Sequence, residues 1–281
     1  NLYNGFINAV AYLERIFETL DEPVTIKDVP DAKPLRPVQG RVTFDDVTFG
    51  YDPGVPILEH LNFDIRAGES IALVGPTGAG KTTVVNLIAR FYDVTSGRIL
   101  VDGQDISQVT LQSLRSQMGI MLQDSFIFSG TIMDNIRYGK LDATEEEIIA
   151  AAKTVCADEF IREFEQGYMT EVNERGSKLS QGQRQLISFA RTLLADPRIL
   201  ILDEATSSID AKTERLLQRG LNELLKGRTT LIIAHRLSTV KNCDRIMYVS
   251  NKGIAESGSH DELIARRGLY HKLYSAQKME A

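Results

Sequence analysis

The strongest constraint on this chain is a glycine-rich segment, Gly75-Pro76-Thr77-Gly78-Ala79-Gly80-Lys81-Thr82. It fits the pattern G-x-x-x-x-G-K-[ST], and it lies between a short apolar strand pattern and a helical pattern. Its glycines allow successive backbone N–H groups to turn towards phosphate oxygens, and the helix N-terminus adds partial positive charge. The segment therefore predicts a phosphate-binding loop. A chance match is disfavoured by the strand–loop–helix context, and a dinucleotide-binding turn by the glycine spacing.

The last two residues of this loop indicate which phosphates are bound. The ammonium of Lys81 is expected to neutralise the β- and γ-phosphates of a nucleotide, and the Thr82 hydroxyl to ligate Mg²⁺. ATP or GTP with Mg²⁺ is therefore the expected ligand of the loop, and the motif described below favours MgATP.

A second motif supports the first. The apolar run Ile199–Leu202 is followed by Asp203 and Glu204. A buried strand of an α/β sheet opens at its carboxyl end onto the crevice where ligands bind. We expect Asp203 to hold Mg²⁺ through water and Glu204 to act as general base on the attacking water. Alone, the motif could equally be a strand that ends in solvated acids.

Strand and helix patterns alternate along most of the chain, which predicts an α/β fold with a mainly parallel sheet. The strand patterns lie at residues 42–47, 61–65, 70–74, 98–101, 119–122, 199–202 and 229–234. The helical patterns lie at residues 82–91, 144–166 and 181–194.

The N-terminal region is predicted to be a helix and a linker. Apolar residues recur at helical spacing over residues 1–20, and Pro23 ends the pattern. The helix could pack on its own domain or continue from an upstream region. Residues 21–40 contain four of the eight prolines, which favours an extended connector and a domain boundary near Gly40.

Charge, cysteine count and the lengths of apolar runs argue against several classes of protein. The net charge of −6 argues mildly against nucleic acid as the main partner. The two cysteines are far apart and indicate a reducing compartment without a disulfide framework. No apolar run approaches the length of a membrane span, and the N-terminus lacks the features of a signal peptide. The first residue is Asn1 and not Met, which suggests a fragment or a processed chain.

The segment Leu179-Ser180-Gln181-Gly182-Gln183 narrows the class. It resembles the Leu-Ser-Gly-Gly-Gln signature of the nucleotide-binding domain of ATP-binding cassette proteins, with Gln181 in place of a glycine. Ser180 is expected to cap the helix that follows, and Gly182 leaves its backbone open. The resemblance covers residue 41 to the C-terminus. It implies a P-loop NTPase (RecA-like) core with a mainly parallel sheet, an antiparallel β subdomain and a helical subdomain.

Other positions match the family one by one. The resemblance implies that Tyr51 stacks on adenine, that Gln123 touches Mg²⁺, and that His235 reaches the γ-phosphate. Ser207-Ser208-Ile209-Asp210 resembles the loop that crosses the dimer interface. The expected catalytic residues are Glu204, His235 and Lys81, and the expected Mg²⁺ ligands are Thr82, Gln123 and Asp203. The nucleotide-binding positions are Tyr51, Gly75, Pro76, Thr77, Gly78, Ala79, Gly80, Lys81, Thr82, Thr83, Gln123, Ser180, Gly182, Gln183 and Asp210.

The exporter subtype is indicated by residues 170–176. They read Thr-Glu-Val-Asn-Glu-Arg-Gly and resemble an exporter stretch in which a glycine usually stands at Asn173. Glu174 would then meet the coupling helices of a transmembrane domain. The implied organisation is the end of the last transmembrane helix (1–22), a linker (23–40) and a cassette (41–281). The cassette would have a core (41–123 and 196–281) and a helical subdomain (124–195).

The resemblance implies an ATP-hydrolysing motor at the cytoplasmic face of a membrane. Two cassettes would close head to tail around two ATP molecules, each held between one chain's loop and the other chain's Ser180, Gly182 and Gln183. Gln181 and Asn173 favour a heterodimer over a homodimer. The alternatives are a non-transport cassette protein such as a translation or repair factor, a nucleotide-gated module that does not hydrolyse, and a small GTPase.

Overall fold

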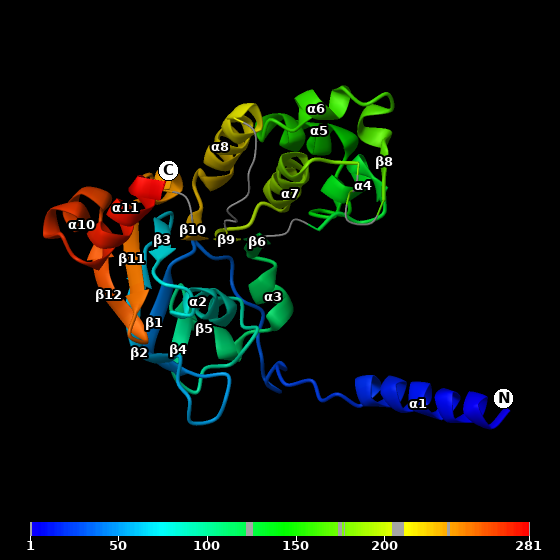
Figure 1. The fold of residues 1–281 in the computed structure, drawn as a ribbon, viewed down its shortest axis with the longest axis horizontal. Helices are drawn as coiled ribbons and strands as arrows, with labels where there is room; N and C mark the ends of the chain where they lie inside the picture. Colours follow the sequence, from blue (N-terminus) through cyan, green and yellow to red (C-terminus); the bar gives the residue numbers. More distant parts are fainter. Residues whose placement is uncertain are drawn as a thin grey trace.

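A computed structural model describes residues 2–121, 126–173, 176, 178–203, 211–234 and 237–280. A six-stranded sheet lies at the centre, in the order β12-β11-β3-β10-β9-β6 (Figure 1). Its strands are β3 (Ser70–Val74), β6 (Met118–Met121), β9 (Ile199–Asp203), β10 (Thr229–Ile233), β11 (Arg245–Ser250) and β12 (Gly253–Gly258). Every neighbouring pair is parallel except β11–β12. The predicted mainly parallel sheet is confirmed.

Parallel pairing brings the carboxyl ends of five strands to one edge of this sheet. β10 lies between β3 and β9, and β6 flanks β9. The central strand β10 is buried over all five residues, which explains its continuous apolar and threonine sequence. The loop after β3 and the acid at the end of β9 therefore lie on the same side of the molecule.

A second sheet is antiparallel, in the order β2-β1-β4-β5. Its strands are β1 (Val42–Phe49), β2 (Leu58–Ile65), β4 (Ser96–Val101) and β5 (Gln104–Asp105). Val42, Phe44, Val47 and Phe49 of β1 are buried, with more exposed residues between them. This partial alternation is typical of a sheet with one face on the core and one face towards solvent. The predicted antiparallel subdomain is confirmed.

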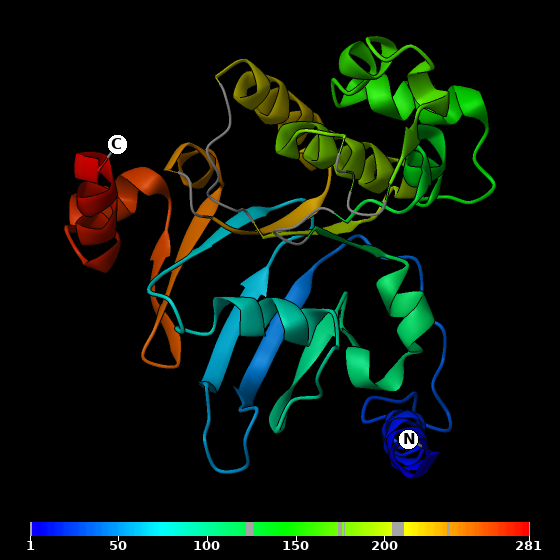
Figure 2. The same ribbon diagram turned by 45° about the vertical axis from the view of Figure 1, so that its right-hand side comes forward.

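The two faces of the central sheet are covered by different helices. α2 (Lys81–Ile88) packs in one hydrophobic cluster with the antiparallel sheet and with Ile199 and Ile201 of β9. α7 (Gln181–Ala195) packs in another cluster with Leu200 and Leu202. Because side chains alternate along a strand, α2 and α7 lie on opposite faces (Figure 2).

Further helices, most of them short, lie around α7. They are α4 (Ile132–Arg137), α5 (Glu145–Thr154), α6 (Asp158–Arg162) and α8 (Ala211–Leu225), with the strand pair β7 (Gly130–Thr131) and β8 (Glu171–Val172) beside them. The remaining helices are η1 (Ile106–Gln108), α3 (Leu111–Arg115), η2 (Gly167–Met169), α9 (Leu237–Lys241), α10 (His260–Arg266) and α11 (Leu269–Glu280).

Two helix predictions need correction. A single helix over residues 144–166 is wrong, because the chain forms α5 and α6 with a break between them. Cys156 lies in that break with φ 63°, a left-handed conformation that stops a helix. The helix predicted over residues 82–91 ends at Ile88. Arg90, at φ 49°, takes the left-handed position there.

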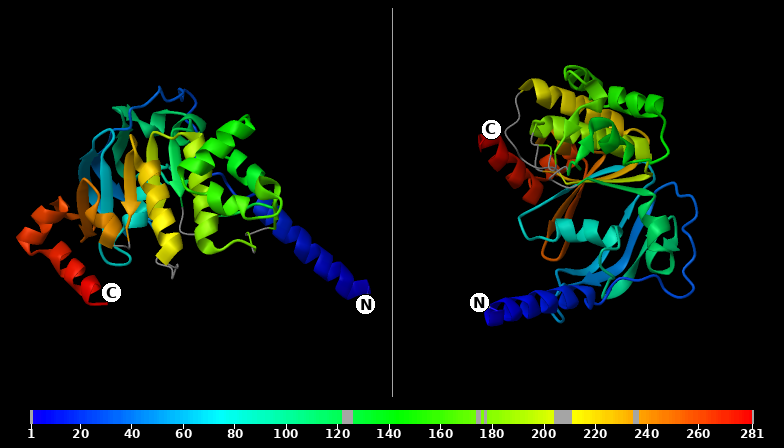
Figure 3. Two further views of the ribbon diagram at one scale, coloured as in Figure 1. Left: turned by 90° about the horizontal axis from the view of Figure 1, so that it is seen from above. Right: turned by 90° about the vertical axis from the view of Figure 1, so that its right-hand side faces the viewer.

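The N-terminal helix α1 (Leu2–Leu20) has the predicted bounds and extends away from the sheets (Figures 1 and 3). The side chains of residues 3–20 are all exposed, so the alternative in which the helix packs on its own domain is wrong. No helix among the described residues is both long and apolar enough to cross a membrane.

The proline-rich connector is irregular, as predicted, but it lies against the body of the protein. Leu35 and Val38 are buried in the cluster that contains α2. The Asp102 carboxylate accepts hydrogen bonds from three successive backbone N–H groups, those of Gln39, Gly40 and Arg41. The connector is therefore anchored along the antiparallel sheet and is not a free tether.

Candidate functional site

The glycine-rich loop joins the end of β3 to the start of α2. Gly75, Gly78 and Gly80 have φ values of 142°, 79° and 99°, in the region that favours glycine. A side chain at Gly75 would also collide with the backbone oxygen of Val249. Gly80 is the N-cap residue of α2 and supplies no side-chain cap to the first-turn N–H groups. The loop therefore presents open backbone donors at a helix N-terminus.

Lys81 lies over this loop. Its ammonium donates hydrogen bonds to the carbonyl oxygens of Gly75 and Pro76, each at 2.9 Å. Burial lowers the pKa of Lys81, and the negative charge of Asp203 opposes that effect. Both observations place a partly desolvated cation next to the loop, where phosphate would be bound.

Asp203 is the last residue of β9 and pairs with Ile233 of the adjacent β10. β3 and β9 both pair in parallel with β10, so the loop that follows β3 and Asp203 at the end of β9 lie at the same edge of the central sheet. The Thr82 side chain is exposed at the first turn of α2. A hydroxyl and a carboxylate are hard oxygen ligands, which fit Mg²⁺ together with nucleotide phosphates. These residues fit the predicted MgATP.

Four predicted site residues lie outside the described residues: Gln123, Glu204, Asp210 and His235. Three of them follow strands of the central sheet directly in the sequence. Gln123 comes two residues after β6, Glu204 one residue after β9, and His235 two residues after β10. The dimer-interface stretch Ser207–Asp210 and the predicted coupling residue Glu174 also lie outside the described residues.

Tyr51 lies near the loop and is 45% exposed. Its hydroxyl is 3.3 Å from the hydroxyl of Thr83, which is buried on α2. Its ring is perpendicular to those of Phe49 and Tyr92, with centroids 5.0 Å away in both cases. The sequence did not reveal Tyr92, because only the fold brings it to Tyr51. The contact with α2 places Tyr51 beside the phosphate-binding loop.

The predicted signature residues begin α7. The Ser180 hydroxyl accepts a hydrogen bond from the Gln183 backbone N–H at 3.2 Å, and the Gln183 side chain accepts one from the Ser180 backbone at 2.9 Å. This capping box confirms Ser180 as the N-cap. A side chain at Gly182 would collide with Thr213 of α8. α7 belongs to the sheet face opposite α2, so its N-terminus and the loop's helix lie on different layers.

Two histidines outside the predicted site contact neighbouring side chains. His60 is exposed and contacts Asp46 at 2.8 Å. His260 contacts the Tyr270 hydroxyl at 2.8 Å. Cys156 and Cys243 are not joined in a disulfide.

Comparison with known proteins agrees with this geometry. Residues 58–207 match the family model described as ABC transporter. An uncharacterized ABC transporter ATP-binding protein of Bacillus subtilis is 53% identical over 99% of the chain and 46% of its own length. A Mycobacterium bovis fatty acid ABC transporter ATP-binding/permease protein is 49% identical over 98% of the chain and 43% of its own length.

A solved structure extends the comparison to the fold. A bacterial Atm1-family ABC exporter with ATP bound superposes with a TM-score of 0.87 at 44% identity, over 98% of this chain and 48% of that one. The chain thus spans about half the length of the relatives it matches. On the family match, the sequence identity and the shared fold, the chain belongs to the ABC transporter family.

Proposed function

We propose that this chain is the ATP-hydrolysing motor portion of an ABC exporter, acting at the cytoplasmic face of a membrane. One observation carries the proposal: the glycine-rich loop follows β3 and Asp203 ends β9, and parallel pairing of both strands with β10 puts the loop and the acid at one edge of the central sheet. The relatives that share nearly the whole chain are named as ATP-binding or export proteins.

Each residue of the site has a proposed role. The loop N–H groups and Lys81 bind the phosphates, and Tyr51 receives the adenine. Thr82, Asp203 and Gln123 hold Mg²⁺, which would neutralise charge between the phosphates. Glu204 takes the proton of the attacking water, and His235 reaches the γ-phosphate. The support for Gln123, Glu204 and His235 is their sequence position after three parallel strands that end at the same edge.

A second cassette completes each site in this proposal. The capped N-terminus of α7, with Ser180, Gly182 and Gln183, presents a helix end suited to phosphate. Because α7 and α2 cover opposite faces of the sheet, the signature is better placed to serve the loop of another chain. In a head-to-tail pair of cassettes, the signature of each chain meets the phosphate-binding loop of the other, with Asp210 at the interface. The altered signature residue Gln181 and Asn173 favour a heterodimer.

The transmembrane partner is proposed to dock on the aromatic surface formed by Phe126, Phe128 and Tyr138. These side chains are 47%, 37% and 59% exposed. Arg191 of α7 lies over the rings of Phe128 and Tyr138 at 5.4 and 5.8 Å and donates to the backbone oxygen of Phe126. Exposed aromatic patches mark interaction sites. This one is linked directly to the helix that begins with the signature.

The neighbouring strand β8 supports that docking face. It pairs with β7 next to α4, and it ends two residues before Glu174, the predicted contact for coupling helices. In this proposal residues 1–22, which include α1, are the end of a transmembrane helix. The anchored connector (23–40) joins this helix to the cassette (41–281). The cassette is divided into a core (41–123 and 196–281) and a helical subdomain (124–195).

An ATPase assay tests the proposed activity. Glu204→Gln should slow turnover about 10²- to 10⁴-fold, the usual contribution of a general base, while nucleotide binding persists. Lys81→Ala should weaken ATP binding itself. Unchanged turnover in Glu204→Gln would remove Glu204 from its role, and wild-type ATP affinity in Lys81→Ala would contradict the loop assignment.

A further inference from the structure

Tyr51 is held at three points although nearly half of it is exposed. Phe49, buried in β1, meets its ring at 86°, and Tyr92 meets it at 81°. At the other end of the side chain, the Tyr51 hydroxyl contacts Thr83. Perpendicular pairs at these distances are favourable because the positive edge of one ring meets the negative face of the other. An exposed tyrosine would otherwise sample several rotamers.

Tyr92 is presented by a rigid turn at the end of α2. The N–H of Phe91 donates to the Asn86 carbonyl, and the N–H of Arg90 donates to the Leu87 carbonyl, with Arg90 left-handed at φ 49°. This is the hydrogen-bond pattern of a Schellman motif, in which glycine is usual at the left-handed position.

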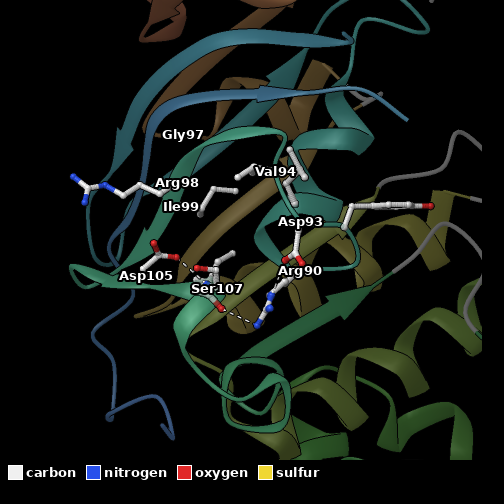
Figure 4. A pocket seen from close by; sticks show the side chains of 11 residues that line it. Arg90, Asp93, Val94, Gly97, Arg98, Ile99, Asp105 and Ser107 are labelled. Carbon is white, nitrogen blue, oxygen red and sulfur yellow. Dashed lines mark hydrogen bonds and ion pairs between the residues drawn. The ribbon is translucent and has the colours of Figure 1, made fainter. Parts of the chain in front are cut away.

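The Arg90 side chain offsets the strain of that conformation. It is 2% exposed and donates to the carbonyls of Lys27, Ile106 and Val109, and to the Asp93 carboxylate at 2.9 Å. Figure 4 shows Arg90 and Asp93 together in the wall of a cavity of about 300 Å³ that Tyr92 also lines. The buried guanidinium of Arg90 thus ties Asp93, the residue after Tyr92, to the turn that precedes Tyr92.

We propose that Tyr92 is a positioning residue for base recognition: its ring holds Tyr51 in the orientation that receives the adenine of ATP. The inference rests on the proposed function, since it assumes that Tyr51 meets the base. Tyr51 has no other fixed ring beside it than Phe49 and Tyr92 among the described residues. Pre-orienting an exposed side chain reduces the conformational entropy lost on binding. A change at Tyr92 should therefore weaken binding of the base and leave binding of the phosphates intact.

The test compares two probes on the whole 281-residue chain: MgATP, and inorganic triphosphate with Mg²⁺, which lacks the base. Tyr92→Leu should weaken ATP binding about 2- to 12-fold, the range that one aromatic pair supplies. Triphosphate affinity should stay within about twofold of wild type, because the loop and Lys81 are intact. Tyr92→Phe keeps the ring and should bind ATP as wild type does.

Two further variants separate positioning from packing. Tyr51→Leu alone should remove the part of the ATP affinity that depends on the base. Adding Tyr92→Leu to it should weaken ATP binding no further, because Tyr92 acts through Tyr51. Phe91→Leu is the matched control: its ring is 40% exposed next to Tyr92 but lies under Arg115 at 5.0 Å. It should leave ATP affinity unchanged.

Three results would overturn the inference. They are equal losses of ATP and triphosphate affinity in Tyr92→Leu, unchanged ATP affinity in that variant, and additive losses in the Tyr51→Leu/Tyr92→Leu pair. In each, wild type still binds ATP and the proposed function stands. A wild-type chain that binds neither probe would overturn the proposed function, and this inference with it.

Discussion

At the scale of single residues, three buried or half-buried side chains organise the protein around its phosphate-binding loop. Lys81 spans the loop, Arg90 fixes the turn after the loop's helix, and Asp102 anchors the connector. Only Lys81 could be recognised from the sequence, because its role is encoded in a local pattern. Arg90 and Asp102 act through backbone groups up to 63 residues away, and residue spacing carries no signal for such contacts.

Arg90→Met should destabilise the fold by about 2–4 kcal/mol, because the change leaves buried carbonyl oxygens without their donor. Urea unfolding of the purified variant measures this. Arg98→Met is a suitable control, since Arg98 makes an exposed ion pair with Asp45. It should cost less than about 1 kcal/mol. Equal losses of unfolding free energy in the two variants would show that the Arg90 side chain does not stabilise the turn.

Tyr270 predicts a pH dependence of stability. The side chain is 1% exposed, and burial raises its pKa to about 12. The folded state therefore favours the neutral phenol. Its contribution is complete below the ordinary tyrosine pKa of about 10 and is lost as the pH rises from there towards 12.

Tyr270→Phe isolates this contribution. The variant loses the hydrogen bond to His260, so it should be less stable than wild type at neutral pH by about 1 kcal/mol. Because phenylalanine does not titrate, the difference should stay constant up to about pH 10 and shrink between about pH 10 and pH 12. Unfolding free energies of both proteins across that range measure it, and a constant or growing difference would contradict the assignment.

At the scale of helices and strands, a local residue pattern predicted the elements that carry one. α1, β3, β9 and β10 were expected at nearly their observed positions, because a helical stripe or a short apolar run marks each of them. The failure at residues 144–166 has a local cause, since left-handed Cys156 interrupts an otherwise continuous helical pattern. The docking of the connector and the pairing of Tyr51 with Tyr92 depend on tertiary contacts, and no local pattern indicates them.

The capping box of α7 gives a prediction with an internal control. Ser180→Ala and Thr144→Ala each remove an equivalent N-cap, from α7 and α5. Each should cost about 1 kcal/mol of stability. Only Ser180→Ala should also reduce ATP hydrolysis, because the proposed function places that hydroxyl against the nucleotide of a second chain. Equal ATPase activity in the two variants would leave Ser180 with a structural role alone.

At the scale of the whole molecule, the central sheet separates the two halves of the proposed site. The phosphate-binding loop opens α2 on one face, while the signature begins α7 on the other. This separation is the physical reason that one chain alone does not bring both halves of the proposed site together. The anchored connector gives α1 a defined attachment to the antiparallel sheet, so a movement of the cassette would be passed to α1.

The most direct test of this account is the mass of the chain in solution with MgATP. Glu204→Gln should slow turnover enough to preserve bound ATP. The double variant Glu204→Gln/Gln181→Gly also restores the glycine of the family signature. With MgATP, the double variant should have twice the single-chain mass of 31.3 kDa. The single variant should associate more weakly. Without nucleotide, both should remain single chains. If both variants bound MgATP and still remained at the single-chain mass, the loop would not be half of a shared site, and the account would be contradicted.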